Sequence, residues 1–355
     1  MAERRAPIAG RYTQQEVALA TRNRGMPLEA LRFDVTPAGL HYLLIHFDIA
    51  AGDEALWRLE VAGAVREPLS IGIAELKAMP ARTLRVTLEC AGNGRGHVSP
   101  RYPSVPWLEE GVSTAEWSGV PLAAVLRRAG LSRAARDVVF HGADRGIDRG
   151  VEHDFARSLE VDEAMGESVL LAYAMNDAPL PPQHGAPLRL VVPGWYGMAS
   201  VKWLRRIEVL EHAFDGLQQA GSYHFKTSAL DPGVPCRRIR VNSAILPPGI
   251  PDFYTRQRTL DAGLVRVSGR AWSGEAPIRR VELAIDGRWH DAELQPARGA
   301  HAWRGWSLEW QAERGEHELA SRATDEFGNV QPLEPPWDLG GFGNNAVHRV
   351  KVSVR

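Results

Sequence analysis

The spacing of apolar residues changes late in the chain, and this change limits the folds that the chain can adopt. In residues 264–272 and 350–354, apolar and polar residues alternate. Residues 281–285 alternate in the same way and end at an Asp286-Gly287 turn. A period of two puts apolar side chains on one face of a strand. Short strands separated by turns over roughly 95 residues predict a β-sandwich.

The earlier part of the chain mixes strand-like and helix-like runs. Three runs predict strands, and they are residues 84–90, 188–192 and 201–209. Residues 120–130 predict a short helix with Pro121 in its first turn and Gly130 at its end. Residues 214–263 contain Pro-Gly turns and no sustained helical period, so we interpret them as a long connection. The expected fold class is α+β, a mixed domain followed by an all-β domain.

Composition excludes several classes of protein. Lys and Arg number 42 and Asp and Glu number 43, so no excess charge attracts the chain to nucleic acid or to an anionic membrane. No apolar run reaches the roughly 18 residues that cross a bilayer. The N-terminal sequence MAERRAPIAGRYTQQ carries charges without an apolar run after them. It predicts a cytoplasmic protein as the chain is written, and a periplasmic one if a leader was removed.

The sharpest local signal is the segment TLECAGNGRG, residues 87–96. An alternating strand delivers Cys90 into a loop with three glycines, whose N–H groups are open to a ligand. Arg95 adds a positive charge, so we expect a thiolate here to have a lowered pKa and to act as a nucleophile or a soft-metal ligand. The alternative is that Cys90 is a small buried apolar residue, as most free cysteines are.

Two further segments carry hydrogen-bond donors. PPQHGAPLRLVVPGWYGMASVK supplies His184, Arg189 and Lys202, which suit a phosphate. The alternative is that His184 caps a turn and Lys202 lies at a strand edge. WDLGGFGNNAVHRVKV supplies Arg349, which by itself is typical of a surface position. The chain lacks HExxH, GxSxG and P-loop motifs, and Cys90 and Cys236 form no CxxC pair.

Four segments in order resemble the sulfite oxidase family of molybdenum-cofactor enzymes. They are TLECAGNGR, WSGVPLAAVL, VLLAYAMNDAPLPPQHGAPLRLVVPGWYGMASVKWLRRI and WDLGGFGNNAVHRVKV. The similarity extends from near Leu40 to the C-terminus. It implies a mixed α/β molybdopterin-binding domain over residues 1–235 and an immunoglobulin-like β-sandwich dimerisation domain over residues 236–355.

The resemblance also implies a function and a set of partners. The chain is expected to oxidise sulfite to sulfate at a molybdenum–molybdopterin centre and to pass the electrons to a separate acceptor such as a cytochrome c. It is expected to form a homodimer. The b-type haem domain of animal family members has no counterpart here, so we expect no haem in this chain. A related alternative keeps the cofactor and reduces an S-oxide, an N-oxide or nitrate.

Individual residues take roles by their position in the resemblance. Cys90 matches the catalytic cysteine that gives a thiolate to molybdenum. The positions that match residues holding the pterin and its phosphate are His46, Asp144, His184, Arg189, Ser200, Val201 and Lys202. The positions that match the lining of the oxyanion pocket are Arg95, Trp107, Tyr223 and Arg349. Because Arg349 lies in the second domain, that domain is expected to reach over the active site.

One position departs from the family pattern. Sulfite-oxidising members carry Arg-Asn-His where this chain has Leu44-Ile-His46. One cation fewer weakens the binding of a dianion, since a hydrogen bond to a charged group contributes about 1.5–3 kcal/mol. Either Arg101 or His97 compensates, or the substrate is a less charged oxo compound such as a sulfoxide, or another oxyanion.

Two hypotheses from other classes of protein remain open at this point. The first is a binding protein on an inactive scaffold, which a purified metal-free protein would support. The second is a cysteine hydrolase with a histidine near Cys90. Inactivation by iodoacetamide in the absence of metal would support the second.

Overall fold

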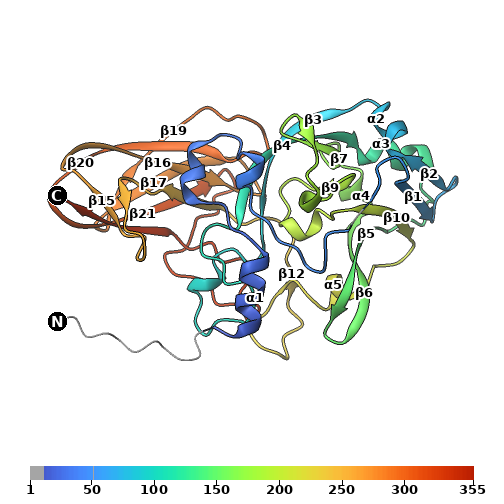
Figure 1. The fold of residues 1–355 in the computed structure, drawn as a ribbon, viewed down its shortest axis with the longest axis horizontal. Coiled ribbons are helices and arrows are strands. Elements are labelled where there is room, and N and C mark those ends of the chain that lie inside the picture. Colours follow the sequence, from blue (N-terminus) through green and yellow to red (C-terminus); the bar gives the residue numbers. More distant parts are fainter. Residues whose placement is uncertain (1–11, 51) are drawn as a thin grey trace.

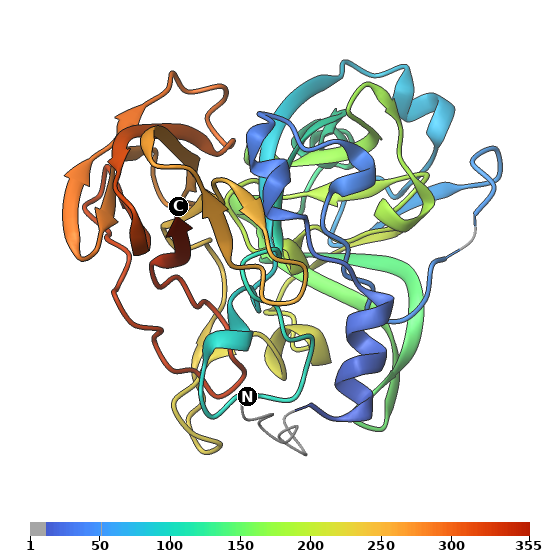
Figure 2. The same cartoon turned by 60° about the vertical axis from the view of Figure 1, so that its left-hand side comes forward.

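Two β-rich regions lie next to each other along the long axis of the molecule (Figure 1). The computed structural model describes residues 12–50 and 52–355. The earlier part of the chain builds the region on the right of Figure 1, and the last part builds the region on the left. A view turned by 60° shows the two regions in contact, with α1 (Gln14–Arg22) beneath the first region (Figure 2).

The first region contains two sheets. One has the order β2-β1-β10-β5-β6, and only the pair β1–β10 is parallel. Its strands are β1 (Arg58–Gly63), β2 (Leu69–Gly72), β5 (Asp137–Asp148), β6 (Val151–Glu160) and β10 (Leu204–Leu210). The other has the order β3-β4-β7-β8, and β9 pairs with β7. Its strands are β3 (Arg82–Glu89), β4 (Val112–Pro121), β7 (Leu170–Met175), β8 (Ala178–Pro179) and β9 (Arg189–Val191).

The helices of the described residues are short. Besides α1, the α-helices are α2 (Ile73–Lys77), α3 (Leu122–Ala129), α4 (Val161–Ala164) and α5 (Leu217–Ala220). The 3₁₀ helices are Leu28–Arg32, Ala38–Leu40, Arg95–His97, Pro182–His184 and Gly197–Ala199. The helix predicted over residues 120–130 is α3. Pro121 is its N-cap, and Gly130 at φ +68 is its C-cap, where a residue with a side chain would be strained.

The second region is a sandwich of two sheets, as predicted. The first has the order β13-β16-β20-β19 and the second the order β14-β15-β22-β21-β17-β18. The strands of the first are β13 (Asn242–Leu246), β16 (Gly263–Trp272), β19 (Glu293–Leu294) and β20 (Arg304–Ala312). The strands of the second are β14 (Ile250–Pro251), β15 (Arg258–Leu260), β17 (Ile278–Ile285), β18 (Arg288–Asp291), β21 (Gly315–Asp325) and β22 (His348–Val354). The observed class is therefore α+β, a mixed region followed by an all-β one.

The interpretation of residues 214–263 as a connection is only partly correct. Residues 214–241 do connect the regions, with the small pair β11 (His224–Phe225) and β12 (Val234–Pro235). Strand β13, however, belongs to the sandwich and pairs along its whole length with β16. This strand has only five residues and is followed by Pro247, so its sequence shows too little alternation to predict a strand.

The N-terminal segment brings residues of both regions together. Arg270 of β16 donates to the carbonyl of Leu31 at 2.8 Å and pairs with Asp34 at 2.8 Å. From there the segment runs to Leu43, whose backbone bonds reciprocally with that of Arg24. Residues 41–46 then contact both sheets of the first region: the N–H of Tyr42 donates to Ser113 of β4 at 3.0 Å, and the ring of His46 stacks on Phe155 of β6.

The outer edge of β3 is covered by the second region. The N–H of Thr87 donates to the carbonyl of His301 at 2.9 Å. The N–H of Trp303 donates to the hydroxyl of Thr87 at 2.7 Å. Since β3 is the end strand of its sheet, this contact pairs backbone groups that would otherwise be open.

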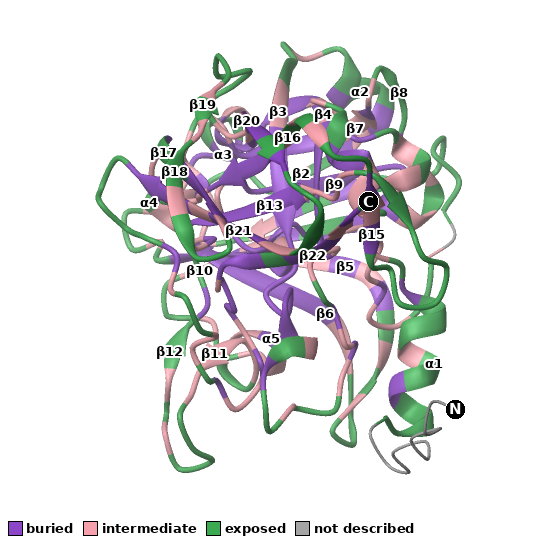
Figure 3. Cartoon of the chain, turned by 90° about the vertical axis from the view of Figure 1, so that its left-hand side faces the viewer, coloured by how far each residue is buried: buried purple, intermediate pink, exposed green. Residues whose placement is uncertain are grey.

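A buried carboxyl group also joins the two regions. Glu89, at the end of β3, accepts hydrogen bonds from Asn93 of its own region and from Asn242 and Trp272 of the sandwich. Buried residues of both regions, Trp272 and Trp303 included, form one continuous apolar core, and the sandwich has a second core of its own. Figure 3 shows the buried strands at the centre of the molecule and the exposed segments around them.

No helix in residues 12–50 and 52–355 has the length and apolar character needed to cross a membrane.

Candidate active site

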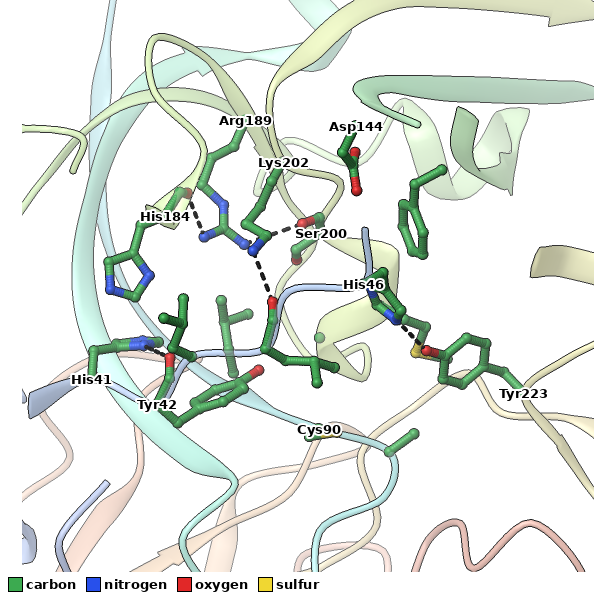
Figure 4. Close-up of a pocket in the computed structure, with 17 residues that line it drawn as sticks. His41, Tyr42, His46, Cys90, Asp144, His184, Arg189, Ser200, Lys202 and Tyr223 are labelled. Carbon is green, nitrogen blue, oxygen red and sulfur yellow. Dashed lines mark hydrogen bonds between the residues drawn. The ribbon is translucent and has the colours of Figure 1, made fainter. Parts of the chain in front are cut away.

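A cavity lies where the N-terminal segment, the end of β3 and the loops around β9 converge (Figure 4). It brings together most of the residues predicted to hold a cofactor. Those that line it are His46, Cys90, Asp144, His184, Arg189, Ser200 and Lys202. We call it the inner cavity. Val201 does not line it, because its side chain is buried in the core; its carbonyl accepts from the N–H of Leu190, and its N–H donates to the carbonyl of Ala199.

Cys90 places a sulfur atom on one side of the inner cavity. β3 delivers it, and its N–H donates to the carbonyl of Gly111 at 2.8 Å. Burial raises the pKa of the thiol, and the positive charge of Arg95 only partly opposes this. The expected lowering of the thiol pKa is therefore wrong, because the loop that carries Arg95 is itself buried. A stable thiolate here needs a further positive partner, such as a metal.

The opposite side of the inner cavity is cationic. Figure 4 shows Arg189 and Lys202 together, away from Cys90. Arg189 donates to the carbonyls of His184 at 2.9 Å and Ser200 at 3.1 Å. Lys202 donates to the carbonyl of Leu44 at 2.8 Å, and burial lowers its pKa to about 7. Neither forms an ion pair with a carboxylate of the described residues, so both suit an anionic ligand such as a phosphate.

Neutral imidazoles and unpartnered polar atoms also line the inner cavity. Burial lowers the pKa of His46 to about 3 and that of His184 to about 2, so both rings are neutral. His41 Nε2 and Asp144 Oδ1 are buried without a hydrogen-bond partner in the described part of the chain. Buried polar atoms without partners are costly. A ligand with several donors and acceptors would satisfy them.

The donor set fits a metal that arrives with ligands of its own. The described residues contain no group of three or more His, Cys, Asp or Glu side chains that could hold a metal ion. Cys90 is thus a single soft ligand, while the cations and the imidazoles can hold an anionic, polar ring system. This combination fits a molybdenum–molybdopterin cofactor, whose sulfur atoms accompany the metal.

A second cavity, which we call the outer cavity, adjoins the first. Leu44, His46, Cys90 and Tyr223 line both cavities, while the predicted residues Arg95 and Trp107 line the outer one. The hydroxyl of Tyr223 lies 2.7 Å from Nε2 of His46. The structure therefore groups Cys90 with three of the four residues predicted to line the oxyanion pocket.

The fourth, Arg349, lies elsewhere. It lines neither cavity, and its guanidinium pairs with Glu318 at 3.0 Å on the surface of the sandwich. The expectation for Arg349 is wrong because burial alternates along β22, and position 349 faces outward.

The second region nevertheless reaches the outer cavity through another part of the same motif. The carbonyl of Gly340 accepts from Nε of Arg95 at 2.9 Å. The ring of Phe342 lines the cavity 5.2 Å from the guanidinium carbon of Arg95. Asn344 donates to the carbonyl of Gly94 at 2.8 Å. The glycine-rich segment GGFGNN was the sequence signal for this contact. The prediction instead chose Arg349, because its charge suits an anion.

Neither residue considered as a substitute for a cation at position 44 is available for that role. His97 pairs with Glu109 at 2.6 Å, and Arg101 pairs with Glu16 and lies over the ring of Tyr12. Neither of them lines the inner or the outer cavity in the described part of the chain. The wall at position 44 is thus apolar.

The chain is similar to known molybdopterin-dependent oxidoreductases. An oxidoreductase molybdopterin-binding domain matches residues 46–218, and a Mo-co oxidoreductase dimerisation domain matches residues 235–355. Mitochondrial sulfite oxidase from Mus musculus is 35% identical over 346 residues, which are 90% of this chain and 62% of that protein. Nitrate reductase [NADH] 1 from Oryza sativa subsp. japonica is 33% identical over 356 residues, 90% of this chain and 38% of that protein.

A solved structure is similar over nearly the whole chain. The sulfane dehydrogenase SoxCD from Paracoccus pantotrophus matches with a TM-score of 0.80 and 25% identity, covering 99% of this chain and 95% of that one. The chain spans only 62% of the length of the curated sulfite oxidases that it matches.

Proposed function

Because the chain belongs to the sulfite oxidase family of molybdopterin-binding oxidoreductases, we propose that it oxidises sulfite to sulfate. The observation that carries the proposal is the inner cavity. It has one buried thiol on one side and, on the other, the buried Arg189 and the partly buried Lys202, neither of which pairs with a carboxylate of the described residues. In this reaction sulfite gains an oxygen atom that derives from water. Two electrons and two protons are released.

The residues of the inner cavity divide the task of holding the cofactor. Cys90 would give its thiolate to molybdenum. Arg189 and Lys202 would bind the phosphate, and the neutral rings of His46 and His184 would bond to the pterin. When bound, the cofactor supplies an oxo-transfer centre that accepts two electrons.

The residues of the outer cavity bind and orient the substrate. Arg95 is buried, and its guanidinium is held by the carbonyls of Gly340 and Val105, so it is fixed before an oxyanion arrives. Tyr223 lies between the two cavities and can hydrogen-bond to an oxygen of the substrate. Trp107 and Phe342 exclude water, which strengthens these interactions.

The proposal includes two partners, a separate electron acceptor and a second copy of this chain. The electrons leave one at a time to an acceptor outside this chain, of which a cytochrome c is an example. The match to a dimerisation domain over residues 235–355 supports a homodimer formed through the sandwich.

A second candidate function is favoured by Leu44. Its side chain lines both cavities at the position where an arginine is expected, which reduces the positive charge facing the substrate. A neutral S-oxide, or a singly charged anion such as nitrate, tolerates this loss better than a dianion does. This candidate uses the same cofactor and runs the oxo transfer in the opposite direction.

The first experiment measures metal and turnover together. The protein is made in a host that synthesises the cofactor, and molybdenum and oxidised pterin are quantified per chain. We expect about one molybdenum per chain and oxidation of sulfite with an artificial electron acceptor. Turnover restricted to dimethyl sulfoxide or nitrate with a reduced dye would replace sulfite by the second candidate. A folded protein without molybdenum or pterin would favour the binding protein instead.

Gly341 offers a test of the contact between the regions. It has φ +66, and an added Cβ would lie 2.6 Å from Cγ of Arg95. We expect Gly341→Ala to displace Arg95 and to raise the KM for sulfite severalfold, besides a backbone cost of about 1–2 kcal/mol. The matched control is Gly328→Ala, because Gly328 has φ +87 and open space around it. Steady-state kinetics with thermal unfolding checks this, and an equal KM in both variants would contradict it.

A further inference from the structure

Buried arginines of this protein fall into two groups. In the described part of the chain they are Arg95, Arg157, Arg189, Arg258 and Arg270. Arg258 pairs with Glu29 and Arg270 with Asp34, each at 2.8 Å. The other three form no ion pair with a carboxylate of the described residues. Arg95 lines the outer cavity and Arg189 the inner one, where a bound anion would neutralise their charges. Arg157 lines neither cavity, so this explanation does not apply to it.

Arg157 lies directly behind the residues that separate the two cavities. It belongs to β6, and its guanidinium carbon is 5.5 Å from the centre of the Tyr223 ring. Phe155, two residues earlier and therefore on the same face of the strand, stacks on His46 with ring centres 4.5 Å apart. Thus β6 supports both members of the hydrogen-bonded pair of Tyr223 and His46.

The hydrogen bonds of Arg157 are incomplete. Its Nη1 donates to the carbonyl of Gln218, a residue that lines the outer cavity. Its Nε is buried without any partner in the described residues. The side chain is 3% exposed, so water does not screen the charge. A buried cation with one carbonyl partner and no anion is costly, and a nearby anionic ligand would offset this cost.

The outer cavity has no cation at position 44. Arg149 also lines this cavity, but its guanidinium lies 3.9 Å from the carboxylate of Asp148 and donates to Gly221 and Ser222. Leu44 is apolar, and His97 and Arg101 are paired elsewhere. The ring of Tyr223 separates Arg157 from the place where an anion would bind. At short range and low dielectric, a charge behind one ring still acts strongly on the other side of it.

We propose that Arg157 is a positioning residue for an anionic substrate. Acting through Tyr223, it supplies the positive charge that is missing because position 44 is a leucine. This inference rests on the proposed function for the identity of the substrate. The inference predicts that a change at Arg157 weakens the binding of anions, and it also predicts how this weakening varies from one anion to another. The effect must grow with the charge of the anion, because the interaction energy is proportional to that charge.

The test compares sulfate with methanesulfonate, a tetrahedral anion of half the charge. Calorimetric titration of the molybdenum-loaded protein measures both affinities for the wild type and for Arg157→Gln. We expect sulfate to bind about tenfold more weakly to the variant and methanesulfonate about threefold more weakly, since halving the charge halves the free-energy difference. With sulfite as substrate, KM should rise by about the same factor as the sulfate constant while kcat changes less.

Two variants complete the design. Arg157→Lys keeps the charge and should restore the preference for sulfate. The matched control is Arg237→Gln, because Arg237 also lies beside an aromatic ring, 5.9 Å from that of Trp195, but pairs with Glu160 and lines neither cavity. It should leave both affinities unchanged. If Arg157→Gln does not fold, Arg157→Met, which removes the charge and keeps an apolar side chain against the ring of Tyr223, takes its place in the comparison of the two anions.

The results distinguish this inference from the proposed function. A wild type that binds sulfate but does not oxidise sulfite would end the proposed function, while the comparison of the two anions would still decide the role of Arg157. Equal weakening of both anions in Arg157→Gln, or none, would overturn the role of Arg157. So would a wild type that does not bind sulfate.

Discussion

Cys90→Ser should reduce turnover per molybdenum by at least about a thousandfold, the scale of loss when a group bonded to the reacting centre is removed. The hydroxyl of serine loses its proton less readily than a thiol does, and its oxygen is a harder ligand than sulfur. It therefore does not replace the thiolate on a soft metal. The pterin should still bind, because the residues proposed to hold it, Arg189, Lys202 and the imidazoles, line the cavity independently of Cys90.

The control for this variant is Cys236→Ser. Cys236 is equally a buried free cysteine, yet its thiol lines neither cavity. Any general cost of placing a hydroxyl in the core appears in both variants, whereas the loss of turnover appears only in Cys90→Ser. Kinetics normalised to molybdenum and pterin content measures the effect. A Cys90→Ser protein with the turnover of the wild type would rule out the ligand role.

Glu89→Ala should lower the free energy of unfolding by at least about 3 kcal/mol. The carboxyl of Glu89 accepts from Asn93 at 2.9 Å, Asn242 at 3.1 Å and Trp272 at 2.9 Å. Its removal leaves three buried donors unpaired, and each costs about 1–3 kcal/mol. Denaturant unfolding measures the loss, and Glu75→Ala, on an exposed ion pair with Arg128, is the control. A loss as small as that of the control would contradict the bridging role.

The same carboxyl group should make stability depend on pH. Burial raises the pKa of Glu89 from its ordinary value of 4.5 to about 7. The folded form therefore binds the proton more tightly than the unfolded form, and this contribution to stability is lost as the pH rises from 4.5 to 7. The melting temperature of the wild type relative to Glu89→Gln should fall between pH 5 and pH 8. A constant difference would show that Glu89 does not titrate there.

Local signals explain what could be predicted from the sequence. The α3 helix was predictable because Pro121 and Gly130 mark its ends, and β3 because residues 84–90 alternate. The inner-cavity residues were predictable because most of them fall in one motif-rich segment around β9. The short strand β13 was missed because five residues between irregular segments show too little periodicity to stand out.

Other features depend on contacts that no local pattern records. Arg349 and Gly340 lie in one motif, yet only the fold decides which of them meets Arg95. Arg157 follows Phe155 in an ordinary strand, and its importance arises only when Tyr223, from a distant loop, packs upon it. The pKa of Cys90 was predicted in the wrong direction because a sequence shows the nearby arginine but not the burial of the loop.

The covered edge of β3 has a consequence for how the protein is made. Trp303, which bonds to Thr87, follows it in the chain by 216 residues. At about 5–20 residues per second, a ribosome delivers this partner roughly 10–40 s after β3 has emerged. Throughout that interval a strand edge with open backbone groups is available to other nascent chains. During biosynthesis, association of this edge with other chains therefore competes with folding until residues 301–303 have been made.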